Sequence, residues 1–223
     1  MIKENLEKIR ATLPKSVTLV AVSKTKPVSD LQEAYDAGQR AFGENYPQEM
    51  RDKHEVLPKD IQWHFIGHLQ TNKIKYIIPF VTLIHSIDSA NLLEAVNKEA
   101  RKHERIVDCL LQFHIAMEET KFGLDMGEAR QLLDSEGFKA MQNVRICGVM
   151  GMATFTDDME EVRKEFKHLK EIFDTLKTEY FAGQPQFKEI SMGMSDDYPI
   201  AVEEGATLVR VGSKIFGARI YNV

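Results

Sequence analysis

Residues 17–23 read VTLVAVS, a nearly continuous apolar run that ends directly before Lys24. Such a run predicts a β-strand buried on both faces, as in a parallel sheet covered by helices. Residues 28–37 then show the apolar spacing of an amphipathic helix. Because the same order of apolar run and amphipathic segment recurs along the chain, the sequence predicts an α/β fold with parallel strands.

The alternation extends over the whole chain. We expect strands at 17–23, 40–43, 62–67, 81–87, 107–115, 144–150, 188–192 and 207–211. We expect helices at 28–37, 46–55, 71–78, 90–103, 126–136, 159–178 and 199–204, after an extra amphipathic helix at the N-terminus. Eight strands favour a closed (β/α)8 TIM barrel, and the absence of a linker rich in Pro or Gly favours a single domain, 1–223. The alternative is an open doubly wound sheet, but no G-x-G-x-x-G motif follows the first strand.

Composition excludes several function classes. The 29 Lys and Arg residues against 34 Asp and Glu residues give a net charge of −5, without the basic cluster that nucleic-acid binding needs. We find neither an apolar run long enough for a membrane span nor a signal peptide. Cys109 and Cys147 lie in apolar runs and are expected to be buried free thiols, which fits a cytoplasmic protein. The His and Cys spacing predicts no metal site.

Lys24 is the first candidate for chemistry, because it follows a buried strand. In a barrel the active groups lie at the C-terminal ends of the strands. A lysine that is partly desolvated there has a lowered pKa, and its neutral amine can attack an aldehyde. The alternative interpretation is a strand-end lysine whose ammonium extends into solvent.

Two loops near the end of the chain are rich in Gly and Ser. They are ISMGMS, with Ser191 and Ser195, and VRVGSKIFG, with Gly212 and Ser213. Barrels often bind a phosphate at the loops after their last two strands, and a short helix beginning at Ser213 would point free N–H groups at an anion. Ordinary turn and cap chemistry is the alternative.

Arg210 interrupts the apolar strand TLVRV, which places its guanidinium inside the barrel or at its mouth. A buried guanidinium needs a partner. That partner is either an acidic side chain such as Glu203 or Glu204, or a ligand acceptor such as a ring nitrogen. An aldehyde-reactive lysine, a phosphate cradle and an interior arginine together describe a site for pyridoxal 5'-phosphate (PLP).

Five ordered motifs carry a resemblance to a known family: VAVSKTKP, FGENYPQE, WHFIGHLQTNK, SMGMSDD and VRVGSKIFGAR. The chain resembles the YggS/PROSC family of PLP homeostasis proteins, whose fold is the fold-type III barrel of alanine racemases. The resemblance implies that Lys24 carries PLP as a Schiff base and that Arg210 approaches the pyridine nitrogen. It also implies that Asn45 lies near the ring and that the phosphate is held by three residues, Ser191, Gly212 and Ser213.

The chain departs from the family pattern at two positions. His68 stands where many relatives have proline, and Ser213 stands where many have threonine. Other candidates have simpler interpretations: His64 as a core histidine, and Trp63 as packing. His114 could reach the mouth but has no nucleophile to pair with. The last two candidates, Lys26 and Lys121, are either solvated cations or temporary acceptors of the aldehyde.

The sequence distinguishes a carrier from an enzyme only in part. Racemisation needs a second acid or base opposite the lysine, which the racemases take from a tyrosine in a C-terminal domain. This chain ends at Val223, directly after the barrel, and only Tyr46 or Tyr198 could substitute. A positive Arg210 also weakens the ring as an electron sink.

We therefore expect a PLP carrier or buffer without a catalytic reaction, and keep a small amino-acid racemase as the alternative. A lysine aldolase acting on a phosphosugar is a third hypothesis. We further expect a monomer that could deliver PLP to apo-enzymes, without nucleic-acid or membrane partners.

Overall fold

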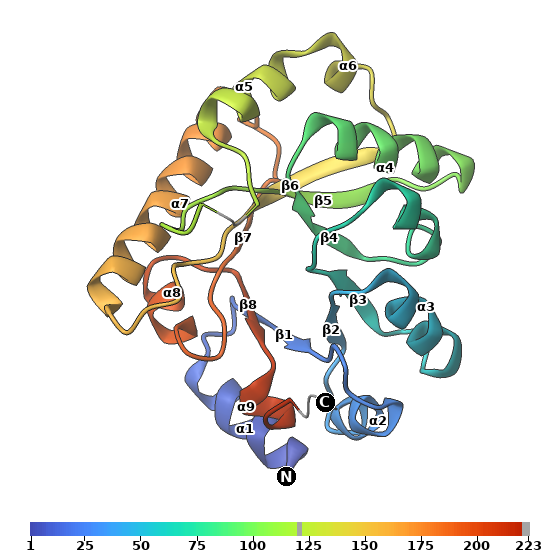
Figure 1. The fold of residues 1–223 in the computed structure, drawn as a ribbon, viewed down its shortest axis with the longest axis vertical. Coiled ribbons are helices and arrows are strands. Elements are labelled where there is room, and N and C mark those ends of the chain that lie inside the picture. Colours follow the sequence, from blue (N-terminus) through green and yellow to red (C-terminus); the bar gives the residue numbers. More distant parts are fainter. Residues whose placement is uncertain (120–121, 220–223) are drawn as a thin grey trace.

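Eight parallel strands close into a barrel in the order of the sequence, and the helices lie outside them (Figure 1). This computed structural model describes residues 1–119 and 122–219. The strands are β1 (Thr18–Val22), β2 (Ala41–Glu44), β3 (Gln62–Phe65), β4 (Leu83–Ile87), β5 (Val107–Gln112), β6 (Val144–Met150), β7 (Glu189–Ser191) and β8 (Leu208–Val211). All eight predicted strands and the TIM barrel are confirmed, and the open-sheet alternative is wrong because β8 pairs with β1.

The outer helices follow the predicted order with two differences. They are α1 (Ile2–Thr12), α2 (Val28–Asp36), α3 (Pro47–Val56), α4 (Ala90–Lys102), α5 (Met126–Asp134), α6 (Glu136–Lys139), α7 (Met159–Glu179), α8 (Tyr198–Glu203) and α9 (Ser213–Phe216). The segment expected as a helix at 71–78 is a 3-10 helix, η1 (Thr71–Tyr76). The helix expected at 126–136 ends earlier, because the side chain of Ser135 accepts the Phe138 N–H and starts α6.

The apolar residues form two layers. The larger core lies between the strands and the surrounding helices. A small cluster fills the barrel interior: Val20, Ala41, Leu83, Leu110, Cys147, Met150 and Leu208. The barrel interior is therefore a packed core of side chains.

The N-terminal helix covers the side of the barrel where the last helix is short. α9 has four residues, and α1 packs against it and against α2 (Figure 1). The three buried side chains of α1, Ile2, Leu6 and Ile9, join the outer core. A hydrogen bond from Asn5 Nδ2 to the Ile215 carbonyl (2.9 Å) ties the two helices together. Helix α1 thus stabilises the segment that follows β8.

Both cysteines are free and buried, as expected. Cys147 belongs to the barrel interior, and burial raises the pKa of its thiol to about 12, so it stays protonated. Within residues 1–119 and 122–219, no helix is long and apolar enough to cross a membrane.

Candidate functional site

A cavity of about 220 Å³ lies at the C-terminal mouth of the barrel. Its wall brings together five of the six residues predicted to bind the cofactor: Lys24, Asn45, Arg210, Gly212 and Ser213. The other wall residues are Val22, Ile66, Met152, Met194, Ser195, Asp196 and Arg219. The sixth predicted residue, Ser191, is buried beneath this wall and does not line the cavity.

Strand register explains why these residues meet. β1 is paired on one side with β8, with Ala21 opposite Val211, and on the other side with β2, with Val22 opposite Gly43. The chain leaves all three strands at the same end. The loops that carry Lys24, Asn45 and Gly212 are therefore neighbours, although they are far apart in the sequence.

The amine of Lys24 is half-buried and faces the cavity. It makes no hydrogen bond, and no ion pair within 4 Å, with any residue that the structure describes. Burial lowers the pKa of Lys24, and the charge of Arg219 lowers it further, while Glu44 and Glu49 act in the opposite direction. An amine with a lowered pKa and no acceptor is suited to react with a carbonyl group. A lysine whose ammonium is fully solvated would not have this environment.

The backbone on both sides of Lys24 is held in place. The N–H of Ser23 donates to the Gly43 carbonyl (2.9 Å), and the N–H of Thr25 donates to Glu49 Oε1 (2.6 Å). Thr25 has a φ of 63°, which is unfavourable for a β-branched residue. Strain of this kind is found at functional sites, where the surrounding contacts over-determine the backbone.

A buried ionic cluster supports the Lys24 loop from below, and sequence reasoning missed it. The Nζ of Lys53 lies 2.7 Å from Glu44 Oε1 and 2.8 Å from Glu49 Oε1, and it donates to the Ser23 carbonyl (2.8 Å). Ser23 Oγ also donates to Glu44 Oε1 (2.7 Å). The only signal in the sequence was that Glu44 ends an apolar strand. Lys53 has the sequence context of an ordinary helix lysine.

Arg210 is buried, and its partners are neutral. Its Nη1 donates to Ser191 Oγ (2.5 Å) and its Nη2 donates to the Gly151 carbonyl (3.2 Å). Burial lowers the pKa of Arg210 to about 10, which leaves it charged at neutral pH, and the charge of Asp197 partly offsets this effect.

Neither of the two acidic residues considered as partners, Glu203 and Glu204, pairs with Arg210. Glu203 and Glu204 bind Arg163 of α7 instead, at 2.6 and 2.7 Å. Among the described residues, Arg210 makes no ion pair within 4 Å. Its guanidinium lines the cavity, so the arrangement leaves this charge available to a ligand.

The two glycine- and serine-rich loops lie side by side at the mouth. The N–H of Gly212 donates to Ser195 Oγ (3.3 Å), and α9 begins at Ser213 as expected. These N–H and hydroxyl donors suit an anion. Ser191, for which the resemblance implies a phosphate contact, has its hydroxyl shared between Arg210 and His85 (2.8 Å).

Asn45 provides an independent test of whether the cavity fits a polar ligand. Its Oδ1 is buried and has no hydrogen-bond partner within the residues described. An unpartnered buried carbonyl oxygen costs free energy, and a ligand that donates or brings in a bridging water would satisfy it. With the Lys24 amine, the Arg210 guanidinium and the loop donors, the cavity has the groups that PLP requires.

The remaining candidates have structural roles or lie outside the described residues. His64 is a buried core histidine, as expected, and His114 binds the Glu118 carbonyl (2.8 Å). Lys26 is no simple solvated cation, because its Nζ donates to three carbonyls of residues 216–218 at the end of α9. His68 stacks on Phe122. Lys121 lies outside the described residues.

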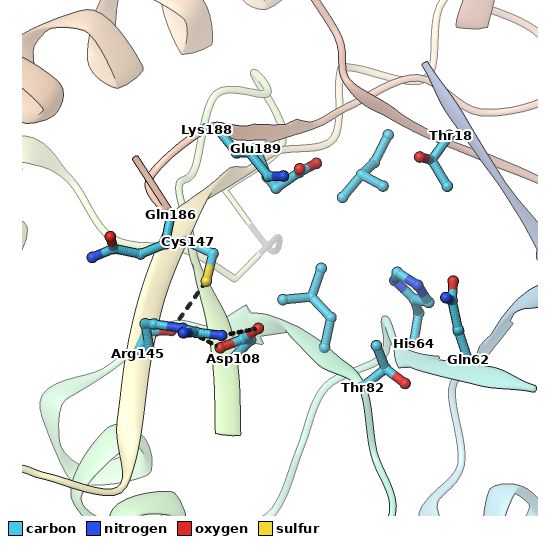
Figure 2. A pocket seen from close by; sticks show the side chains of 12 residues that line it. Thr18, Gln62, His64, Thr82, Asp108, Arg145, Cys147, Gln186, Lys188 and Glu189 are labelled. Carbon is cyan, nitrogen blue, oxygen red and sulfur yellow. Dashed lines mark hydrogen bonds and ion pairs between the residues drawn. The ribbon is translucent and has the colours of Figure 1, made fainter. Parts of the chain in front are cut away.

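A second cavity, of about 420 Å³, lies at the N-terminal end of the barrel (Figure 2). Its charged groups are of both signs: Arg145 and Asp108 form an ion pair (2.7 Å), and Lys188 and Glu189 lie above them. It is larger than the mouth cavity, but it lacks the strand-end loops that carry the chemistry in barrels. No group of three potential metal ligands is found in the part of the chain that the structure describes.

Comparison with known sequences agrees with this geometry. The family model of the alanine racemase N-terminal domain matches residues 1–220. The pyridoxal phosphate homeostasis protein of Aquifex aeolicus is 41% identical over 204 residues, which cover 91% of this chain and 87% of that protein. The protein of the same name from Vibrio alginolyticus is 36% identical over 236 aligned residues, which cover 99% of both chains.

Solved structures show the same relationship. PipY of Synechococcus elongatus, solved without PLP, superposes with a TM-score of 0.90 at 38% identity, over 97% of this chain and 100% of that one. PipY has also been solved with PLP bound, and that structure superposes with a TM-score of 0.87. Alanine racemase from Bartonella henselae shares the fold, with a TM-score of 0.73 at 16% identity. The chain therefore belongs to the alanine racemase N-terminal domain family and, within it, to the pyridoxal phosphate homeostasis proteins.

Proposed function

We propose that this protein binds PLP at the C-terminal mouth of its barrel, through Lys24, and acts in PLP homeostasis as a carrier or buffer. The observation that carries the proposal is the Lys24 amine, which is half-buried and has a lowered pKa and no acceptor among the described residues. The names of the relatives and the PLP bound to PipY support the same ligand.

Each part of the cofactor has a matching group on the cavity wall. When bound, PLP supplies an aldehyde that condenses with an amine, with loss of water. Lys24 would provide that amine, and Gly212, Ser213 and Ser195 would hold the phosphate. Arg210 would face the ring nitrogen, and the unpartnered Oδ1 of Asn45 would bind a donor on the ring or a bridging water.

The position of the two candidate tyrosines favours a carrier over a racemase. Tyr46 is 53% exposed, and neither it nor Tyr198 lines the cavity. The hydroxyl of Tyr198 lies 3.2 Å from Thr12 Oγ1, so it is engaged with α1. Racemisation needs an acid or base on each face of the substrate, and Lys24 serves one face only. The names of the relatives also describe homeostasis and no reaction.

The finer features of this function are proposed as well. We infer a cytoplasmic monomer in which residues 1–223 act as one PLP-binding domain, with apo-enzymes as the recipients of PLP.

Binding is tested by adding PLP to the purified protein, reducing with borohydride and mapping the labelled peptide. We expect the label on Lys24. Before reduction we expect an absorbance band at about 420 nm, which is lost in Lys24→Ala and Lys24→Arg. Lys188→Ala, which alters a lysine of the other cavity, should keep the band. A label on Lys188, or a band that survives in Lys24→Ala, would overturn the proposal. Failure to bind PLP at all would favour the aldolase hypothesis.

Catalysis is tested on the PLP-loaded protein with a panel of amino acids. We expect no turnover approaching an ordinary enzymatic rate of about 1 per second. A racemisation rate of that size would replace the carrier by the racemase. Transfer of PLP to an apo-enzyme, measured by recovery of that enzyme's activity, is expected in the same conditions.

A further inference from the structure

A chain of buried polar side chains crosses the interior of the barrel. It starts at Arg210, whose Nη1 donates to Ser191 Oγ (2.5 Å). Ser191 Oγ lies 2.8 Å from His85 Nδ1, and His85 Nε2 lies 2.8 Å from His64 Nδ1. All four side chains are buried, from 0% exposed for Ser191 and His85 to 5% for His64. This series of hydrogen bonds therefore joins the cavity that Arg210 lines to the N-terminal cavity that His64 lines (Figure 2).

Hydrogen-bond satisfaction gives this chain a direction. A guanidinium can only donate, so Ser191 Oγ accepts from Arg210. The hydroxyl proton of Ser191 then needs an acceptor, and the one available among the described residues is His85 Nδ1. His85 must carry its proton on Nε2 and donate it to His64 Nδ1. His64 in turn carries its proton on Nε2, and the ring of His64 lines the N-terminal cavity.

The opposite direction leaves a buried group unsatisfied. If His85 donated from Nδ1, Ser191 would accept twice, and its own proton would have no acceptor in the described part of the chain. Both imidazoles must also be neutral, and burial favours this. Burial lowers the pKa of His64 to about 4, and burial, His64 and Arg210 together lower the pKa of His85 well below its usual value.

We propose that His85 is a positioning residue that acts on the cofactor site through Ser191 and keeps the guanidinium of Arg210 aimed at the ring of bound PLP. The inference rests on the proposed function, since it concerns the orientation of a group that would face PLP. By accepting the Ser191 proton, His85 leaves the serine lone pairs for Arg210. The Gly151 carbonyl holds the other end of the same guanidinium (3.2 Å).

The use of neutral partners has an electrostatic consequence. A carboxylate at the position of Ser191 would also hold Arg210, but it would neutralise much of its charge. A hydroxyl backed by a neutral imidazole orients the guanidinium and leaves the positive charge directed at the cavity. His85 thus supports a cationic contact at the ring, and His64 supports His85 from the far end of the barrel.

The first test needs no cofactor. Nitrogen NMR of ¹⁵N-histidine-labelled, PLP-free protein at neutral pH reports which ring nitrogen carries the proton. We expect both His64 and His85 to be neutral Nε2–H tautomers, identified by loss of each signal set in His64→Leu and His85→Leu. A protonated His85, or a proton on its Nδ1, would overturn the proposed direction of the chain, whatever the protein binds.

The second test measures the effect on the site. We expect Ser191→Ala and His85→Leu to weaken binding of PLP and of pyridoxal, which lacks the phosphate, by the same factor of about tenfold, and to shift the absorbance maximum of the bound cofactor. His85→Gln, which offers both an acceptor and a donor, should restore most of the affinity. The exposed His168→Leu is the control.

The outcomes separate this inference from the proposed function. Unchanged affinity and absorbance in Ser191→Ala and His85→Leu would refute the positioning role while PLP binding stands. A wild-type protein that binds no PLP would refute the proposed function, and the tautomer measurement would still decide the hydrogen-bond chain. Loss of PLP affinity with retention of pyridoxal affinity would make Ser191 a phosphate ligand instead.

Discussion

The Nζ of Lys53 lies 2.7 Å from Oε1 of Glu44, and both side chains are almost completely buried. A lysine is rarely buried, because its desolvation must be balanced by charge and hydrogen bonds. Here Lys53 also binds Glu49 and the carbonyl of Ser23, the residue directly before Lys24. The ion pair therefore connects α3 to the loop that presents the reactive amine.

Replacement of Lys53 by methionine should destabilise the protein. Lys53→Met leaves Glu44 buried without its cation and frees the Ser23 carbonyl, so we expect a loss of about 3 kcal/mol in the free energy of unfolding at pH 8. Urea unfolding followed by circular dichroism measures it. Lys8→Met, on the exposed side of α1, should change stability by less than about 0.5 kcal/mol. Equal stability of the two variants would show that the buried pair contributes nothing.

Glu44 should make stability depend on pH. Burial raises its pKa from 4.5 to about 7, although Lys53 opposes the shift. Below pH 4.5 the carboxyl is protonated in both the folded and the unfolded chain. As the pH rises from 4.5 to 7, the unfolded chain releases the proton before the folded chain does. The contribution of Glu44 to the free energy of unfolding therefore falls, by about 3 kcal/mol at most.

The measurement is the difference in unfolding free energy between the wild type and Glu44→Gln at several pH values from 4 to 8. We expect the wild type to lose stability relative to the variant as the pH rises. A difference that stays constant, or grows in favour of the wild type, would contradict a raised pKa for Glu44.

Substitutions of Ser195 and Ser213 should affect only the recognition of the phosphate group. Ser195→Ala and Ser213→Ala each remove a hydroxyl from the wall of the cavity, so we expect each to weaken PLP binding by about tenfold. Binding of pyridoxal should stay unchanged, because it has no phosphate. Fluorescence titration with both compounds measures this, with the exposed Ser29→Ala as the control. Equal losses for PLP and pyridoxal would place these serines away from the phosphate.

Gly193 is required by the loop after β7. Its φ is +98°, and a Cβ there would lie 2.6 Å from Cβ of Ala201. Gly183, with a φ of +73° and no atom within 4 Å of a Cβ, is a matched control for the backbone alone. We expect Gly183→Ala to cost about 1 kcal/mol and Gly193→Ala at least about 3 kcal/mol, because only the latter adds a steric clash. Thermal unfolding that ranks them equally would contradict this.

Much of the fold could be predicted from the sequence, because the signals are local. The apolar run before Lys24 and the seven runs after it identify buried strands by their composition, and their alternation with helices indicates a parallel barrel. The failures were also local. Residues 71–76 form a 3-10 helix that periodicity does not distinguish from an α-helix, and Ser135 starts a new helix inside an apparently continuous pattern.

The candidate site was predictable where it depends on position along a strand. Each of four residues, Lys24, Asn45, Gly212 and Ser213, lies within two residues of the C-terminal end of a strand, so a barrel places them together at one end. The role of Ser191 was harder to predict. It is the last residue of β7 but does not line the cavity, and only the direction of its side chain shows that it meets Arg210 and His85.

The sequence by itself determined the barrel and the set of polar residues at its mouth, because apolar periodicity and strand ends are properties of neighbouring residues. The tertiary structure alone decided which polar side chains meet inside. Ser191 and His85 are 106 positions apart, and Lys53 reads as a surface lysine until α3 folds over Glu44. Such contacts depend on strand register and side-chain direction, which the closure of the whole barrel sets and no local pattern encodes.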